Sequence, residues 1–209
     1  RGLGDVYKRQ MEGERLACGS AHADNVAPAL LGGFTLVRDT NPLDICALPT
    51  PLELVATVIH PKIEVKTADA RAVLKKRVTL EKAISQWGNV GALVSSLYEE
   101  DYDLLSRSLI DGIVEPTRAI LIPHFSELKA ACKEAGALGS GISGSGPSVF
   151  ALSRGMPAAN TVAKAMQSVL EKTNIPFDIH VSPVKKTGVS FIEDPVSYTH
   201  LRAHETSLH

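Results

Sequence analysis

The chain has 209 residues, enough for one large domain or one and a half small ones, and its 44% hydrophobic and 22% charged content is typical of a globular protein. With a net charge of −1 at pH 7, the chain lacks the excess positive charge that is typical of nucleic-acid-binding proteins. No apolar run reaches the ~18 residues that a membrane span needs. Three scattered cysteines indicate neither a disulfide framework nor a metal cluster. We therefore expect a cytoplasmic protein with no nucleic-acid or membrane partner.

The two ends of the chain differ from the rest. Residues 1–10 have no hydrophobic period, and the last fifteen residues hold three of the seven histidines. Both ends resemble translated adapter sequence more than a folded element, so we predict that 1–10 and 194–209 are non-native or disordered tails. The fold is then carried by residues 11–193, and Met11 need not be a true start.

The predicted elements alternate between strands and helices. Apolar and β-branched runs bounded by Gly and Pro predict the first two strands. From Leu80 the apolar period becomes 3.6, which places Trp87 and Leu97 on one helix face and predicts that Trp87 lies in the core. The predicted strands are 32–39, 52–60, 147–152, 177–184 and 188–193, and the other predicted helices are 67–77, 102–113, 122–136 and 157–174.

This order predicts an α+β sandwich with antiparallel strands in one layer and helices in the other. We expect the strands within 32–60 to belong to a different sheet, whose other members are absent. That expectation places a domain boundary near residues 60–66. Cys18 and Cys132 are predicted to be buried small hydrophobes.

The stretch GSGISGSGPSVFAL, residues 139–152, places four glycines within eight residues before a strand. Glycine permits positive φ and close approach of other groups, and successive N–H groups in such a loop can bind an anion. No G-K-[ST] follows, which excludes a Walker loop, and no helix follows, which excludes a dinucleotide fingerprint. A phosphate-facing loop and a plain structural turn both remain open.

A second dense stretch contains short polar side chains. His22, Asp24 and Asn25 lie within four residues, with Glu12 and Glu14 shortly upstream. Such a cluster suits a small polar substrate and Mg²⁺, which takes one or two protein carboxylates together with substrate phosphates. A turn or a helix cap is an equally open interpretation of Asp24 and Asn25.

Four separated motifs occur in the order HADNVAPALLGGFTL, TADAR, VEPTR with LIPHF, and SGISGSGPSVFAL. Together they closely resemble the homoserine kinases, a family of the GHMP kinase superfamily, over essentially all of 11–193. The resemblance implies a GHMP-kinase-like two-domain fold. In it, 11–62 is the end of the N-terminal domain and 63–193 is a C-terminal ferredoxin-like α/β sandwich.

The same resemblance implies an activity. The family phosphorylates the side-chain hydroxyl of L-homoserine with ATP to O-phospho-L-homoserine, on the way to threonine. Its N-terminal P-x-x-x-G-L-G-S-S loop, which wraps the ATP phosphates, is not in this sequence. We therefore expect an incomplete fragment that is inactive by itself.

Site residues are also implied by the resemblance. Glu14, eight residues before His22, would hold Mg²⁺ between the β- and γ-phosphates, and Glu12 is the alternative. His22, Asp24 and Asn25 match the stretch that contacts the substrate, with Asp24 or Asn25 near the homoserine hydroxyl and ammonium. Whether Asp24 acts as a base is left open, because phosphoryl transfer depends more on alignment and charge neutralisation.

Arg71 in TADAR and Arg118 in VEPTR match the two arginines that hold the substrate carboxylate. A guanidinium meets a carboxylate with two parallel hydrogen bonds, although each arginine by itself would be interpreted as a surface residue. The residues expected to support the phosphate loop are Gly141, Ser143, Gly144, Ser145 and Gly146.

Two other functions remain open from the sequence. The chain could be another GHMP kinase that acts on a different small alcohol, or a non-catalytic amino-acid-binding domain. The arginine pair favours an amino-acid carboxylate over a sugar. Frequent dimerisation in the superfamily leaves a homodimer open as well.

Overall fold

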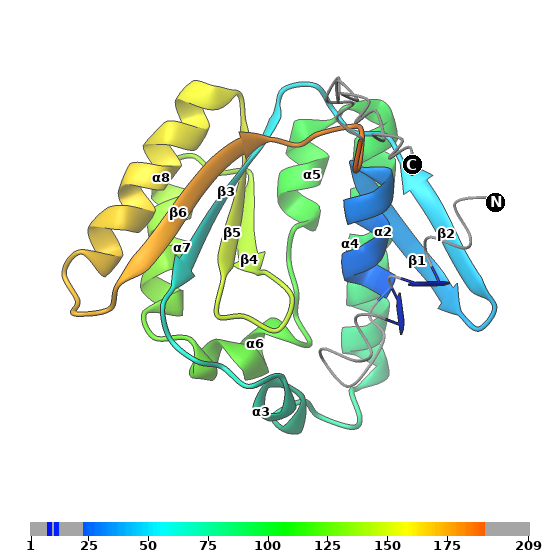
Figure 1. The fold of residues 1–209 in the computed structure, drawn as a ribbon, viewed down its shortest axis with the longest axis horizontal. Coiled ribbons are helices and arrows are strands. Elements are labelled where there is room, and N and C mark those ends of the chain that lie inside the picture. The colour runs from blue at the N-terminus through cyan, green and yellow to red at the C-terminus, as the bar shows by residue number, and fades with distance from the viewer. Residues whose placement is uncertain (1–7, 10, 13–22, 191–209) are drawn as a thin grey trace, which may run out of the picture.

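The computed structural model describes residues 8–9, 11–12 and 23–190, and a four-stranded antiparallel sheet lies at its centre (Figure 1). The strand order is β4-β5-β3-β6, so the strands that are adjacent in space are not all adjacent in sequence. The strands are β3 (Leu54–Pro61), β4 (Gly139–Ile142), β5 (Val149–Arg154) and β6 (Phe177–Pro183).

β3 is a central strand of this sheet. It pairs with β5 along one edge and with β6 along the other, with Thr57 opposite both Ala151 and Val181. Its burial alternates with a period of two, and Leu54 and Ile59 are completely buried. The prediction that this segment belongs to a different sheet is therefore wrong. The division of the chain at 62/63 into two domains stays a prediction.

One face of the sheet is covered by α7 (Phe125–Glu134) and α8 (Met156–Leu170). Ile59 and Val149 project from the strands toward Leu128 of α7 and toward α8, and all three side chains are fully buried. With β3, α7, β4, β5, α8 and β6 in chain order, this unit has the ferredoxin-like arrangement that the sequence predicted. Figure 1 shows α7 and α8 on the same side of the strands.

The opposite face is covered by α4 (Leu80–Glu99) and α5 (Tyr102–Ser108). Leu97 of α4 and Leu105 of α5 form a buried cluster there with the strand residues Leu54 and Leu152. The two helices meet at a sharp break because Glu100 adopts φ 53°, which ends α4. The side chain of Asp101 then accepts hydrogen bonds from two backbone N–H groups of α5. An aspartate at this position supplies an acceptor to the otherwise unpaired first turn of a helix.

The apolar face of α4 is buried only toward its C-terminal end. Leu97 is fully buried, but Ile84 is 56% exposed and Trp87 65% exposed among the described residues. The prediction that Trp87 lies in the core is therefore wrong. A 3.6-residue period reports that a helix has an apolar face, but it does not report how far along the helix a partner extends.

A hairpin and a short helix form a second unit beside the sheet. Helix α2 (Ala23–Leu31) packs its Val26 and Ala27 toward the hairpin of β1 (Phe34–Thr40) and β2 (Leu43–Leu48). Strand β2 was not predicted from the sequence, and its pairing with β1 places Leu36 opposite Cys46. β2 is apolar at five of its six positions, but a short apolar run does not by itself distinguish a strand from a buried helical segment.

The C-terminal segment differs from its prediction. Residues 188–190 form no strand, and 191–193 lie outside the described residues. Instead this segment runs over the end of α2, where the Val189 N–H donates to the Ala29 carbonyl at 3.1 Å. A Cβ atom on Gly188 would lie 2.0 Å from the Leu30 carbonyl oxygen, so only glycine permits this approach.

The remaining helices are short: α3 (Thr67–Ala72), α6 (Glu115–Arg118) and the 3₁₀ turn η1 (Ala119–Leu121). In the part of the chain that the structure describes, no helix combines the length and the apolar character needed to cross a bilayer. Cys132 is fully buried, as predicted, and Cys18 lies outside the described residues.

Burial gives Cys132 a testable pH dependence. Desolvation raises the pKa of its thiol from 9.0 to about 11, against a smaller opposing effect of a hydrogen bond with Ser140. A folded-state pKa above the unfolded value means that the stabilisation is complete below pH 9 and is lost as the pH rises to about 11. We expect the stability advantage of the parent chain over Cys132→Ala, measured by urea unfolding, to shrink across this range.

The matched control is Cys46→Ala, because Cys46 is exposed. The pH-dependent loss of the parent's stability advantage should be larger over Cys132→Ala than over this variant. An equal or absent loss for Cys132→Ala would contradict the assignment of a raised pKa to the buried thiol.

Candidate substrate site

Arg118 joins three segments that are distant in sequence. Its Nε donates to the backbone carbonyl of Ala70 in α3 at 3.1 Å, and its Nη1 donates to the carbonyl of Gly144 at 2.9 Å. Arg118 is itself the last residue of α6. The structure therefore brings the VEPTR, TADAR and glycine-rich motifs to one place, which spacing along the chain could not show.

The turn before the short helix α6 is held by an aspartate, Asp111, that was not predicted from the sequence. One carboxylate oxygen of Asp111 accepts from the backbone N–H groups of Ile113 and Val114 at 2.9 and 2.8 Å, and the other accepts from Glu115 at 3.0 Å. Ile113 and Val114 precede α6, and Glu115 is its first residue, so Asp111 fixes the turn that leads into the helix and one N–H group of its first turn. The signal in the sequence was an aspartate shortly before Glu-Pro.

Two amides of α4 fix the loop before this cap. Gln86 accepts from the Gly112 N–H at 3.0 Å and donates to the Ile110 carbonyl at 3.4 Å. Asn89 donates to the same carbonyl at 3.0 Å. These contacts join the loop that carries Asp111 to a 20-residue helix. The position of Arg118 thus depends on side chains of α4 as well as on α6.

Glu115 anchors the first turn of α6 to α7. Its carboxylate, 13% exposed, forms an ion pair with Lys129. A Cβ atom on Gly141 would lie 3.3 Å from the Glu115 carboxylate and 3.1 Å from the Phe150 ring. Gly141 therefore lies in strand β4 and permits close packing at this point, and its predicted contribution to a phosphate loop stays a prediction.

The glycine-rich stretch divides into a strand and a turn. The prediction of a loop over 139–146 is wrong for 139–142, which form β4. The turn is closed by bonds from the Ser143 N–H to the Ser148 carbonyl (2.8 Å) and from the Gly146 N–H to the Ser143 carbonyl (3.0 Å). Gly144 and Gly146 have φ of 59° and 81°, which glycine adopts without strain.

A cavity of about 310 Å³ opens beside Arg118 and the turn. Polar side chains of α4, of the capping loop and of α6 contribute to its wall: Gln86, Asn89, Asp111, Glu115 and Arg118. This volume is near the lower limit of common small-molecule pockets, ~300 Å³. The cavity therefore has the size and the polar groups for a small, charged metabolite.

Arg71 follows Ala70 directly in α3, so its backbone lies within one residue of the carbonyl that Arg118 contacts. Asp24 and Asn25 lie elsewhere, in the exposed first turn of α2. In the view of Figure 1 this first turn is the lower end of α2, on the side of α3 and α6. The predicted site residues Glu14 and His22 lie outside the described residues.

Three comparisons identify what the chain is similar to. Residues 80–172 match the family model described as GHMP kinases C terminal. The chain is 53% identical over 184 residues to a homoserine kinase of Chlorobium phaeobacteroides, a match that covers 87% of this chain and 58% of the relative. Residues 80–172 form a GHMP kinase C-terminal domain.

The homology extends across most of the chain. A homoserine kinase of Pyrococcus furiosus is 40% identical over 179 residues, covering 86% of this chain and 60% of the relative. The crystal structure of homoserine kinase from Cytophaga hutchinsonii superimposes with a TM-score of 0.87 at 53% identity, covering 90% of this chain and 60% of that one. This chain is therefore a homologue of homoserine kinases, and it spans about three fifths of the length of these relatives.

More distant structures show the fold alone. Mevalonate kinase of L. major, 17% identical with a TM-score of 0.66, matches 88% of this chain and 59% of its own. The α+β GHMP kinase fold predicted from the sequence is confirmed by these matches and by the sheet order.

The Asp111 contacts give a prediction about the stability of this candidate site. Asp111→Ala removes the acceptor of three backbone N–H groups, and the loss of a side-chain acceptor of this kind at a helix start costs about 0.5–2 kcal/mol. We expect urea unfolding of the variant to show a loss of this size. Glu134→Ala, which removes an exposed carboxylate at the end of α7, is the control and should change stability little. Equal losses in the free energy of unfolding for the two substitutions would show that the Asp111 hydrogen bonds contribute no measurable stability.

Proposed function

We propose that the protein to which this chain belongs is a homoserine kinase that transfers the γ-phosphoryl group of ATP to the side-chain hydroxyl of L-homoserine. Relatives at 53% and 40% identity bear this name. The observation that carries the proposal is the position of Arg118, which is bonded to both α3 and the glycine turn and lines the small polar cavity. ATP as the co-substrate follows from the proposed activity.

Arg118 is suited to orient an amino-acid carboxylate. Two of its five N–H donors are used by the Ala70 and Gly144 carbonyls, so the guanidinium plane is held while three donors remain. A guanidinium that is fixed before the substrate arrives loses little conformational entropy on binding. Arg71, one residue beyond Ala70, is proposed as the second carboxylate ligand.

Positioning is what this reaction requires most. Phosphoryl transfer has a loose transition state, so alignment of the hydroxyl and neutralisation of phosphate charge supply most of the rate enhancement. In the proposed site Asp24 or Asn25 lies near the hydroxyl and ammonium of the substrate, together with His22. Ser143, Gly144, Ser145 and Gly146 form the turn proposed to lie beside the phosphates, where Gly144 and Ser143 are exposed.

Mg²⁺ is proposed as the cofactor, with Glu14 as its protein ligand. Within the described ranges no group of three or more His, Cys, Asp and Glu side chains could hold a metal ion. A single carboxylate is sufficient for Mg²⁺ when substrate phosphates and waters complete its octahedral shell. The ion would neutralise charge on the β- and γ-phosphates.

The alternatives are another GHMP kinase with a different alcohol as substrate and an amino-acid-binding domain without catalysis. The homology to homoserine kinases supports the proposed function over both. A role in threonine biosynthesis follows from that function. A cytoplasmic location, a homodimer and the absence of nucleic-acid and membrane partners stay expectations.

A direct assay tests the function. In a chimera, this chain replaces its matching part in the Chlorobium phaeobacteroides homoserine kinase, and ADP release is coupled to NADH oxidation. We expect ADP release that depends on L-homoserine and a much slower reaction with mevalonate, which lacks an α-amino-acid group. Equal rates with both alcohols would favour the broader GHMP kinase alternative, and homoserine binding without turnover would favour the binding domain.

The carboxylate role of the arginines gives a second prediction. In the chimera, Arg118→Ala or Arg71→Ala removes charge-assisted bonds of about 1.5–3 kcal/mol, or roughly ten- to a hundredfold in affinity. The KM for homoserine should rise by this factor while the KM for ATP changes far less. The control is Arg107→Ala, an exposed arginine of α5. Equal rises in both KM values would argue against carboxylate binding.

The proposed metal ligand gives a third prediction for the chimera. Glu14→Gln should lower the rate at limiting Mg²⁺ and regain part of it as Mg²⁺ is raised, because the variant weakens the ion's binding without removing the phosphate ligands. Glu12→Gln is the matched variant, because Glu12 is the alternative candidate for the Mg²⁺ ligand. A rate defect that is independent of Mg²⁺ would remove Glu14 from the metal site.

A further inference from the structure

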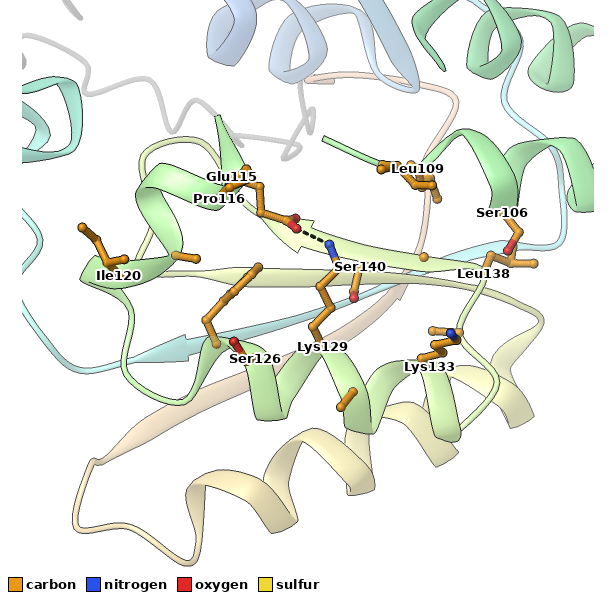
Figure 2. A pocket seen from close by; sticks show the side chains of 16 residues that line it. Ser106, Leu109, Glu115, Pro116, Ile120, Ser126, Lys129, Lys133, Leu138 and Ser140 are labelled. Atoms are coloured by element: carbon orange, nitrogen blue, oxygen red, sulfur yellow. Dashed lines mark hydrogen bonds and ion pairs between the residues drawn. The ribbon is translucent and has the colours of Figure 1, made fainter. Parts of the chain in front are cut away.

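A second and larger cavity lies on the other side of α6. Its volume is about 900 Å³, and it is bounded by the α5–α6 segment, by α7 and by β4 (Figure 2). β4 is at the edge of the sheet, so the cavity follows a strand that has a partner on one side only among the described strands. Volumes of 300–1,000 Å³ are typical of sites for small organic ligands.

The wall of this cavity is mostly apolar. Leu109, Ile120, Phe125 and Leu138 contribute side chains from four different segments. Ile120, on the short turn after α6, lines this cavity and is 76% exposed, so its apolar side chain is open to water. A ligand with an apolar body would remove this surface from water, at about 25 cal/mol per Å².

The polar groups of the cavity carry an excess positive charge. Lys129 and Lys133 are four residues apart on α7 and therefore lie on one helix face. Glu115 pairs with Lys129, and the dashed line in Figure 2 marks this contact. Lys133 has no ion pair within the described part of the chain, although it lines the same cavity. One positive charge is thus left without a carboxylate partner.

We propose that this cavity binds a small organic carboxylate with an apolar body, whose anionic group pairs with Lys133 and with the neighbouring Lys129. The apolar walls take up the body of the ligand, and the two ammonium groups select an anion over a neutral or cationic molecule. This cavity adjoins the substrate cavity beside Arg118, and four residues line both of them: Leu109, Ile110, Glu115 and Ser140.

The shared Glu115 gives the ligand a way to act on the substrate site, a consequence that rests on the proposed function. A carboxylate that binds Lys129 competes with Glu115 for the same ammonium group. Glu115 and Arg118 are the first and last residues of the four-residue helix α6. Weakening the anchor of α6 therefore disturbs Arg118, and we expect the bound anion to raise the KM for homoserine and leave the KM for ATP unchanged.

The test uses 4-(trifluoromethyl)phenylacetate as the probe and its neutral amide as the matched ligand. Binding to the chimera is followed by ¹⁹F NMR titration, which does not require kinase activity. We expect the carboxylate to bind more tightly than the amide. Lys133→Met should weaken carboxylate binding about tenfold, which is the value of one charge-assisted hydrogen bond, and leave amide binding unchanged.

Lys164→Met on α8 is the control, because Lys164 is exposed and does not line the cavity. Ala137→Phe fills the cavity without changing its charge and should weaken both ligands. The proposal is overturned if Lys133→Met leaves carboxylate affinity unchanged, or if Lys164→Met lowers it equally. It is also overturned if the isolated chain binds the probe and the chimera does not, because the rest of the protein or a second copy then covers the cavity.

The kinetic readout separates this proposal from the proposed function. If the chimera phosphorylates homoserine, saturating probe should raise the KM for homoserine severalfold in the parent and not in Lys133→Met. If the chimera has no kinase activity but the NMR pattern holds, the homoserine kinase proposal fails and the binding site stands. Unchanged KM values despite probe binding would overturn the coupling through Glu115.

Discussion

The architecture depends on the double pairing of β3. This strand is bonded to β5 and β6 along its two edges and is covered by helices on both faces, with Leu54 and Ile59 completely buried. Every later element of the ferredoxin-like unit packs on a sheet that β3 completes. Because its side chains are buried on both faces, β3 contributes hydrophobic stabilisation to both helical layers.

The candidate substrate site lies beside the edge strand of the same sheet, β4. β4 is short and rich in glycine, so Glu115 approaches it closely and the turn that follows reaches Arg118. The four-residue helix α6 has almost no intrinsic stability, and it owes its position to Asp111, to the Glu115–Lys129 pair and to the Arg118 bonds. A small helix held by such contacts at both ends can respond to a ligand on either side of it.

The sequence predicted much of the fold and named the residues that the structure brings together. Periodicity predicted α4, α7 and α8, and the motif resemblance connected Arg118 with TADAR and the glycine turn before any contact was known. The predictions that Trp87 is buried and that β3 belongs to a different sheet were wrong. A local apolar pattern shows which face of an element is apolar, but it does not show which other element packs against that face. Asp111 was missed because capping contributes one side chain to a loop without apolar periodicity.

By itself the sequence determined the order of the elements, the α+β class and the family motifs, because propensities and apolar periods are properties of neighbouring residues. Only the tertiary structure decided that β3 joins β5 and that Arg118 bonds Ala70 and Gly144. It also decided that one lysine of α7 pairs with Glu115 while the next lines an apolar cavity without an ion pair in the described ranges. Such contacts join residues tens of positions apart, and only the packing of the whole chain brings them within hydrogen-bonding distance.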